Sequence, residues 1–523
     1  MSAMISTSLR RCLLPSRRVS PLLQTCRTRR TQARALHGAA AAGVTQGDKK
    51  MKTFDDLPGP SGLTELYWFF IRGYLLHTHE LQVIYKKRYG PWWKSVLGDN
   101  KAVIVTDPAI LEVLLRQEGK NPLRNDIDLW RTHREMRNFS YGPFTERGEK
   151  WRALRTVLNQ KMLKPKEAKN YGGSINEVIS DFMTRLQELR RQSPSGDTVT
   201  DMANELYRFA LEGVSYIVFE TRIGCLDKHI PPETQKFINS IAQMFRNFVF
   251  VIYLPPWTRN LLPYWKRYLD NWDNIFHFGN KLVDKKMSEI QSRLEKGQEV
   301  QGEYLTYLLS SGKISLPEVY GSVCELLLAG VDTTSNTLCW SLYHLSQDPE
   351  LQQSLYEEVI MAAPMDRIPV ADDITHMPLL RAVIKETLRL YPVVPTNARY
   401  ITENEVVIGD YKFPKNTLFV LNHYAIARDE ANFKDPEKFS PQRWLRGQVM
   451  THHPFSAIPF GYGLRACVGK RIAELEMHLA LSRIIRMFEV KPDPTVKNVK
   501  SISRIVLSPN KKINLRFIER KSV

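Results

Sequence analysis

Leucine, isoleucine and phenylalanine recur at spacings of three and four residues over most of the chain, which is typical of helices that bury one face. Clear examples cover residues 175–191 and 271–294. Strand-like segments are short and cover residues 101–106, 405–408, 418–421 and 505–507. No linker-like segment divides the chain after residue 60. The pattern therefore predicts a mainly α-helical single domain with small β-sheets.

One predicted helix is exceptional in length and in composition. It begins at a capping-box pattern, Ser315 to Glu318, and continues to Gln347. At ~1.5 Å per residue it spans about 50 Å, the width of a domain. It is largely apolar, but its centre, residues 329–335, holds a glycine, an aspartate and three hydroxyl side chains. We expect these hydroxyls to bond back to carbonyls and to open a kink or groove. An exposed polar patch is the alternative, and the apolar flanks argue against it.

Composition narrows the class of protein. The chain has 523 residues, of which 43% are hydrophobic and 25% are charged. These values exclude a disordered chain, a collagen and a multi-span membrane protein. No window holds ~18 uninterrupted apolar residues, so we expect no transmembrane helix. The apolar run at 245–257 ends in two prolines and fits equally a buried helix end or an element that dips into a membrane surface.

The positive charge is concentrated at the N-terminus. Residues 1–47 hold eight arginines and no acidic residue, whereas the net charge of the whole chain is +19. An arginine-rich, hydroxyl-rich and acid-free beginning is typical of an organelle transit peptide. We therefore predict a mitochondrial transit peptide over about residues 1–45 and one domain over 46–523. A basic tail that binds RNA or anionic lipid is the alternative; we expect no nucleic-acid partner.

The cysteines show no metal-binding or disulfide spacing, but Cys467 stands out among the six. It follows a glycine-rich turn with Gly461 and Gly463, and a helical pattern begins just after it. A thiolate at a helix N-terminus is stabilised by free backbone N–H groups and can serve as an axial haem ligand. A buried structural cysteine is the alternative interpretation.

The stretch from Phe460 to Gly469 fits Phe-x-x-Gly-x-Arg-x-Cys-x-Gly, which resembles the haem-binding loop of cytochrome P450 enzymes. Segments 329–333, 386–389 and 441–444 match other family motifs in the required order. The resemblance runs from about residue 54 to the C-terminus. It implies the cytochrome P450 fold, with a single haem domain, and haem b whose iron is held by the Cys467 thiolate.

The resemblance also implies roles for other residues. Asp332 and Thr333 are expected to be catalytic and to deliver protons for oxygen activation. Glu386, Arg389 and Arg443 are expected to form a structural network that supports the haem loop. The haem propionates are expected to contact Arg465, Trp151, Arg155 and Arg399.

The transit-like N-terminus indicates the mitochondrial class, which receives electrons from a small acidic [2Fe-2S] ferredoxin and its NADPH-dependent reductase. Arg381 and Lys385 lie four residues apart, where this class places two basic residues for that partner; the family usually has lysine at the first position. Peripheral attachment to the matrix side of the inner membrane is expected, and the resemblance places the run at 245–257 between two helices that touch the membrane.

Further stretches resemble the mitochondrial members that use O₂ to hydroxylate the terminal side-chain carbon of cholesterol and bile-acid-precursor sterols, and that can also 25-hydroxylate vitamin D₃. A vitamin D or retinoid hydroxylase of the same family is an alternative, because pocket shape decides regioselectivity. A haem-binding protein without monooxygenase activity is an alternative of another class. The expected substrate pocket consists of Ala329, Val331, Val393, Val394, Thr396, Asn397 and Val506.

Overall fold

A computed structural model describes residues 51–97, 100–124, 128–298, 300, 302–447, 452–504 and 506–520. The predicted transit peptide and Ile505 lie outside these residues. From Lys52 onward the chain forms one compact unit. Its helices are α2 (Gly62–Leu66), α3 (Thr78–Tyr89), α4 (Pro108–Arg116), α5 (Asp128–Arg137), α6 (Gly148–Met162), α7 (Pro165–Asn170), α8 (Gly172–Gln192), α9 (Met202–Phe219), α10 (Pro232–Tyr253), α11 (Pro263–Glu295), α12 (Tyr304–Ser310), α13 (Leu316–Gln347), α14 (Pro349–Ala362), α15 (Pro378–Leu390), α16 (His423–Ala427) and α17 (Lys470–Met487).

Short 3-10 and π turns connect these helices. They are η2 (Phe54–Asp56), η3 (Tyr67–Ile71), η4 (Tyr74–Leu76), η5 (Pro256–Asn260), η6 (Asp373–His376), η7 (Pro441–Trp444) and η8 (Pro454–Ser456).

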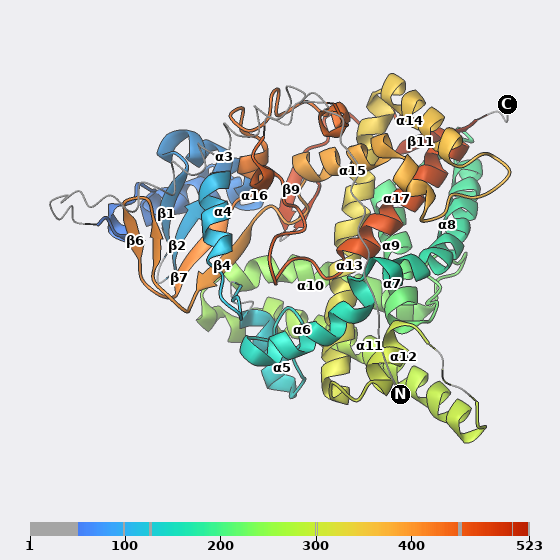
Figure 1. The fold of residues 1–523 in the computed structure, drawn as a ribbon, viewed down its shortest axis with the longest axis horizontal. Helices are drawn as coiled ribbons and strands as arrows, with labels where there is room; N and C mark the ends of the chain where they lie inside the picture. The colour runs from blue at the N-terminus through green and yellow to red at the C-terminus, as the bar shows by residue number, and fades with distance from the viewer. Residues whose placement is uncertain are drawn as a thin grey trace, which may run out of the picture. The chain divides into compact units, whose positions relative to one another are not determined.

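The strands form four small sheets. The largest has the order β1-β2-β7-β4, in which β2 and β7 run parallel and the other neighbours run antiparallel. This sheet lies on one side of the unit and the long helices lie on the other (Figure 1). The smaller sheets are β3-β11-β8, β10-β9 and β5-β6. The strands are β1 (Trp92–Leu97), β2 (Asn100–Val105), β3 (Thr198–Val199), β4 (Asn397–Ile401), β5 (Val406–Ile408), β6 (Tyr411–Phe413), β7 (Thr417–Leu421), β8 (Phe488–Pro492), β9 (Ser501–Arg504), β10 (Val506–Pro509) and β11 (Leu515–Glu519).

The long helix α13 forms as its sequence predicts. The Glu318 carboxylate accepts hydrogen bonds from the N–H and the hydroxyl of Ser315, both at 2.7 Å, which closes the first turn. A methyl group at Gly330 would lie 2.7 Å from Cγ2 of Val214, so glycine is what allows α9 to pack closely against α13.

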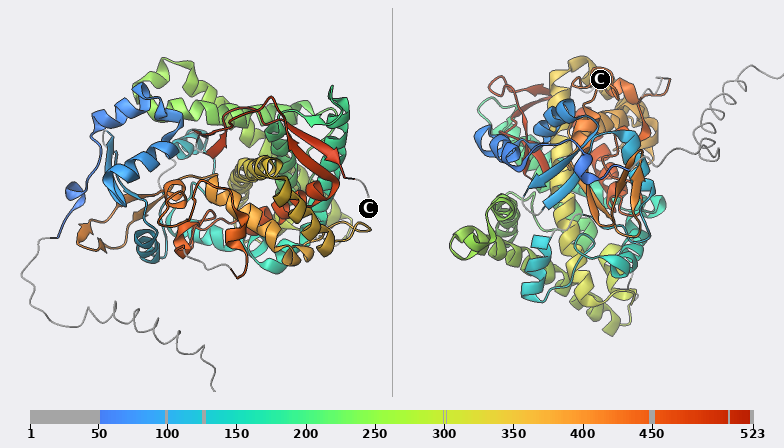
Figure 2. Two further views of the ribbon diagram at one scale, coloured as in Figure 1. Left: turned by 90° about the horizontal axis from the view of Figure 1, so that it is seen from above. Right: turned by 90° about the vertical axis from the view of Figure 1, so that its left-hand side faces the viewer.

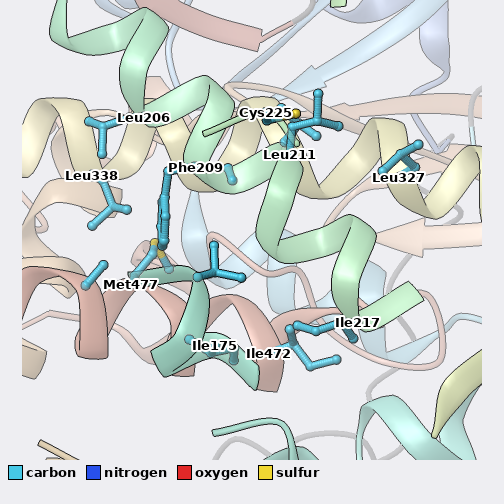
Figure 3. Packing of buried hydrophobic residues seen from close by; sticks show 14 of the residues in the cluster. Ile175, Leu206, Phe209, Leu211, Ile217, Cys225, Leu327, Leu338, Ile472 and Met477 are labelled. Carbon is cyan, nitrogen blue, oxygen red and sulfur yellow. The ribbon is translucent and has the colours of Figure 1, made fainter. Parts of the chain in front are cut away.

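The main hydrophobic core lies where α9, α13 and α17 meet. Figure 3 shows Phe209 of α9, Leu338 of α13 and Met477 of α17 among neighbouring buried side chains. A second, smaller core lies under the largest sheet, where Val103 and Phe419 pack with Leu111 of α4. One hydrophobic core thus stabilises the helical region, and another stabilises the sheet region.

The structure confirms the mainly helical prediction and corrects the interpretation of the apolar run at 245–257. That run was expected between two helices, but most of it forms the last turns of α10, which ends at Tyr253. Pro255 and Pro256 then begin η5. The helix pattern continues until the prolines remove backbone donors, which is why the boundary falls there.

Candidate functional site

The loop before α17 holds Cys467 in a tight turn. The Cys467 N–H donates to the carbonyl oxygen of Phe460 at 2.8 Å. Gly461 and Gly463 adopt φ angles of +72° and +73°, in the left-handed region where a side chain would be strained. A side chain at Gly463 would also lie 2.9 Å from Oε2 of Glu118. The backbone therefore requires glycine at 461 and 463, whereas Gly469 has an ordinary negative φ.

Opposing effects act on the pKa of the Cys467 thiol. Desolvation of the thiol raises its pKa, while the Gly469 N–H and the charges of Arg155, Arg124 and Lys470 act to lower it. The residue is half-buried. Such a thiol is held as a thiolate once a metal ion binds it, because the ion's charge outweighs the desolvation cost.

Four arginines from distant parts of the chain gather beside this loop, and we call them the arginine cluster. Arg155, Arg399 and Arg465 are buried, and Arg124 is half-buried. The Arg465 guanidinium lies 3.5 Å from the centre of the Trp151 ring and donates to the Pro122 carbonyl at 2.8 Å. Arg155 donates to the Ala466 carbonyl at 2.5 Å, and Arg124 donates to the Arg465 carbonyl. The structure thus brings together all four predicted propionate contacts, since Arg399 pairs with Glu118 at the same place.

The arginine cluster has one carboxylate, Glu118, to balance four guanidinium groups. Burial and the neighbouring arginines lower the pKa of Arg465 to about 8 and that of Arg124 to about 9. Within the described part of the chain, Glu118 is the carboxylate that acts on both of these arginines. Nε1 of Trp151 and Nε of Arg124 are buried and have no hydrogen-bond partner among the described residues. An anionic group that accepts hydrogen bonds, such as the two propionates of a haem, fits this set of donors.

Helix α13 has four half-buried residues at its centre, within an otherwise buried stretch. Of residues 321–342, all are buried except Ala329, Gly330, Asp332 and Thr333, which are half-buried. Oδ2 of Asp332 has no partner among the described residues, and burial raises the pKa of Asp332 to about 7. The Thr333 hydroxyl donates to the Ala329 carbonyl at 2.8 Å, the expected back-bonding.

Glu386, Arg389 and Arg443 form a closed network between α15 and the segment that leads to η7. Arg389 donates to both carboxylate oxygens of Glu386 at 2.9 Å, and Arg443 donates to Oε1 at 3.0 Å. The Ser440 N–H and the Trp444 indole add bonds at 2.9 and 2.8 Å. Burial alone would raise the pKa of Glu386, but Arg389, Ser440 and Arg443 lower it below its ordinary value.

The two basic residues of α15 lie on its exposed side, where Nζ of Lys385 is 6.0 Å from the centre of the Trp444 ring. Arg381 and Lys385 are exposed, whereas Glu386 and Arg389 on the same helix are 0% and 1% exposed. One face of α15 is therefore buried in the network, and the other presents positive charge.

The predicted pocket residues do not share one environment. Ala329, Thr396, Asn397 and Val506 are half-buried, Val393 is buried, and Val394 is exposed. The Asn397 side-chain oxygen accepts from Arg399 at 3.0 Å, so this residue positions the arginine cluster. Val331 is 0% exposed and packs in the main core, where it leaves no surface for a substrate.

Sequence reasoning missed two members of this region, Glu118 and Arg124. Both precede α5 in loop segments, where no helical spacing marks a side chain as inward-facing. Arg124 reaches Arg465, and Glu118 reaches Arg399. These partners are more than 280 positions away in the sequence, so only the fold reveals them.

Exposed apolar side chains gather in two short segments: Leu63, Phe70 and Ile71 of α2 and η3, and Trp257 and Leu261 near η5. Both segments lie at the upper edge of the left view in Figure 2 and at the left edge of the right view. None of the described helices is both long enough and apolar enough to span a membrane.

Comparison with known proteins adds the family context. The family model described as Cytochrome P450 matches residues 58–517. Over 487 residues the chain is 51% identical to "Sterol 26-hydroxylase, mitochondrial" of Rattus norvegicus, covering 92% of this chain and 91% of that protein. It is 40% identical to "25-hydroxyvitamin D-1 alpha hydroxylase, mitochondrial" of the same species, with 93% and 98% covered. The solved structure of a cytochrome P450 heme domain shares the fold, with a TM-score of 0.73, 22% identity and coverage of 90% and 98%.

Proposed function

The chain belongs to the cytochrome P450 family, and from that premise we propose that it is a mitochondrial monooxygenase that hydroxylates the terminal side-chain carbon of a sterol. The observation that carries the proposal is the 51% identity to a mitochondrial sterol 26-hydroxylase over nearly the whole of both chains. The family carries a haem with a cysteine thiolate ligand. When bound, this haem supplies the activation of O₂ and the transfer of one oxygen atom into a C–H bond.

Cys467 is the residue that we propose as the axial ligand of the haem iron. The support is its half-buried position directly before α17 and the hydrogen bond that fixes its N–H on Phe460. The Gly469 N–H, Arg155 and Arg124 stabilise the thiolate form. These groups offset part of the desolvation that raises the pKa of Cys467, and the bound iron would hold the thiolate form.

The arginine cluster and Trp151 would hold the propionates. Arg465, Arg155 and Arg124 offer donors beside a buried and unpaired Trp151 Nε1. Uncompensated positive charge of this kind is costly until an anion arrives, so it favours the loaded protein over the haem-free one. Glu118 and Asn397 orient Arg399, which we assign to the same role.

Asp332 and Thr333 are our candidates for proton delivery. They lie in the half-buried centre of α13, which packs against α17. The raised pKa of Asp332, about 7, lets its carboxyl group both hold and release a proton near neutral pH. The Thr333 hydroxyl lies on the next residue and can pass that proton on.

The exposed pair Arg381 and Lys385 is our candidate docking surface for an acidic [2Fe-2S] ferredoxin that is reduced through an NADPH-dependent reductase. Two cations on one exposed helix face suit steering of an acidic partner. The exposed apolar side chains Phe70, Ile71, Trp257 and Leu261 suit peripheral contact with the matrix side of the inner membrane. In the same proposal residues 1–45 are a transit peptide and residues 46–523 the haem domain.

A vitamin D hydroxylase is the second candidate, because the chain is also 40% identical to a 25-hydroxyvitamin D hydroxylase. The test is parallel turnover of a cholesterol-derived sterol and vitamin D₃ by purified protein with ferredoxin, its reductase and NADPH. Terminal side-chain hydroxylation of the sterol supports the first proposal. Turnover of vitamin D₃ alone would overturn the sterol assignment and leave the family intact.

A further inference from the structure

Three possible metal ligands converge where α3 begins, on the segment between the apolar turn η3 and the sheet. His77 precedes the helix, and His79 and Glu80 occupy its first turn. Nδ1 of His77 lies 3.5 Å from Oε1 of Glu80, and Nε2 of His79 lies 3.9 Å from the same oxygen. Each side chain can place one donor atom within 4.8 Å of the donors of the other two.

The surroundings hold one ligand rigidly and leave the others accessible. The His79 side chain is 0% exposed, and its ring packs edge-on against Tyr424 with 4.8 Å between ring centres. Its Nε2 is 2.9 Å from the Ser501 hydroxyl on β9. The His77 and Glu80 side chains are 32% and 39% exposed, so an ion and its water ligands can reach the site.

Two nitrogen atoms at this place are left without partners. Nδ1 of His77 and Nδ1 of His79 are buried and form no hydrogen bond with any described residue. Nδ1 of His77 lies beside the Glu80 carboxylate, and an unsatisfied imidazole nitrogen there is costly in a folded protein unless a ligand satisfies it. The His79 atom that faces Glu80 is Nε2, so Nδ1 of His79 does not point to this site. A cation that accepts electron pairs from nitrogen and oxygen would satisfy Nδ1 of His77.

We propose that His77, His79 and Glu80 bind one Zn²⁺ ion, with water completing the coordination. Two histidines and one carboxylate with an open fourth position form a known zinc donor set. Ca²⁺ and Mg²⁺ prefer oxygen ligands and fit this set poorly. Ligands at ~2.0–2.1 Å from a tetrahedral ion are about 3.3 Å apart, so donors that lie within 4.8 Å of one another need to close by about 1.5 Å at most.

The nearest cation does not block the site. Arg428 acts on His79, but its guanidinium stacks on the Tyr424 ring at 3.9 Å and pairs with Glu437 at 3.3 Å. A bound ion would replace the Ser501 hydroxyl as the partner of His79 Nε2, so this hydrogen bond opens when the site is filled. This proposal stands on side-chain geometry alone and is independent of the proposed hydroxylase activity.

The test is a Zn²⁺ titration of the purified, tag-free holoprotein against a competing fluorescent chelator. We expect one saturable site whose affinity falls at least about 10-fold in His77→Ala and in Glu80→Gln. Both side chains are partly exposed, so these variants should fold. His453→Ala is the matched control, because His453 pairs with Glu112 at 3.1 Å but belongs to no three-ligand group among the described residues.

Zinc K-edge absorption of the one-equivalent complex provides a second readout. The wild type should show scattering from two imidazoles, and His77→Ala from one at most. Absence of a saturable site, or an affinity that is unchanged in both His77→Ala and Glu80→Gln, would overturn the proposal. An equal loss in His453→Ala would also overturn it, because the binding would then not be local to α3.

Discussion

Two groups of charged residues, the Glu386 network and the arginine cluster, are built on opposite principles. In the first, Glu386 accepts from Arg389, Arg443, Ser440 and Trp444, so its charge is fully satisfied within the protein. In the second, the arginine cluster of Arg124, Arg155, Arg399 and Arg465 has Glu118 and neutral acceptors for its positive charges.

The pKa shifts report the same difference. The pKa of Glu386 is lowered despite burial, because the ion pairs outweigh desolvation. Burial lowers the pKa of Arg389 as well, but Glu386 opposes that shift. In Arg465 and Arg124 the neighbouring arginines add to the lowering, which means that their charge is costly. A network whose charges are balanced stabilises the fold, whereas a cluster with unbalanced positive charge favours the binding of an anion. Chemically similar residues can therefore be assigned structural or binding roles from charge balance alone.

The largest effect is expected from opening the closed network. Glu386→Ala leaves Arg389 buried without its partner, which costs about 3–5 kcal/mol of unfolding free energy. Urea unfolding followed by circular dichroism measures it, with the exposed Glu357→Ala as the control. A loss of unfolding free energy below about 1 kcal/mol would show that the closed network does not stabilise the fold as described.

The arginine cluster should respond in the opposite way. Arg124→Met removes one uncompensated charge, so the haem-free protein should lose little or no stability. Haem affinity should fall about 10- to 100-fold, because a charge-assisted hydrogen bond contributes ~1.5–3 kcal/mol. Competition for haem with apomyoglobin, alongside urea unfolding of the haem-free form, measures both quantities. Unchanged haem affinity with a large stability loss would place Arg124 in the structural class.

Glu476 sharpens the comparison, because it is a buried carboxyl group with no cation to compensate it. It is 3% exposed, Oε1 has no partner among the described residues, and burial raises its pKa to about 8. Its neutral form favours folding, so stability should fall as pH rises from about 4.5 to about 8, by up to ~1.4 kcal/mol per pH unit. Glu476→Gln should flatten this dependence in unfolding curves measured at several pH values. An identical pH profile in the variant would contradict the assignment.

The smallest effect on stability is expected for the charges that face solvent. Arg381→Ala with Lys385→Ala should change the unfolding free energy by less than about 0.5 kcal/mol. Affinity for the ferredoxin should fall roughly 10-fold at low salt and converge with the wild type at high salt, because exposed charges are screened. Titration of the ferredoxin at two ionic strengths checks the loss of affinity at low salt and its disappearance at high salt. A loss of ferredoxin affinity that does not depend on salt would argue against electrostatic docking.

Local patterns in the sequence predicted much of this molecule. The capping box of Ser315 and Glu318, the spacing of Glu386 and Arg389 and the glycines around Cys467 are short-range signals, and each predicts its own local geometry. The contents of the arginine cluster are long-range. Arg124 and Glu118 lie in loops and acquire their roles by meeting Arg465 and Arg399 across the fold.

The apolar pattern was ambiguous for a different reason. Val331 lies on the same helix as Asp332 and Thr333 but turns into the core, and hydrophobicity cannot distinguish a core side chain from a pocket side chain. The run at 245–257 was also compatible with two structures. The prolines at 255 and 256 end α10 just before them, but Phe250, Ile252 and Trp257 are exposed, so contact of this helix end with a membrane stays a prediction.

The most direct test is the optical spectrum of the reduced, carbon-monoxide-bound protein, measured for the wild type and for Cys467→Ala after reconstitution with haem. The wild type should show the red-shifted Soret band of a thiolate-ligated haem. The variant should lose that band while circular dichroism shows an intact helical fold. A thiolate-type spectrum that persists in Cys467→Ala, or that is missing from folded and haem-replete wild type, would contradict the assignment of Cys467 as the haem ligand.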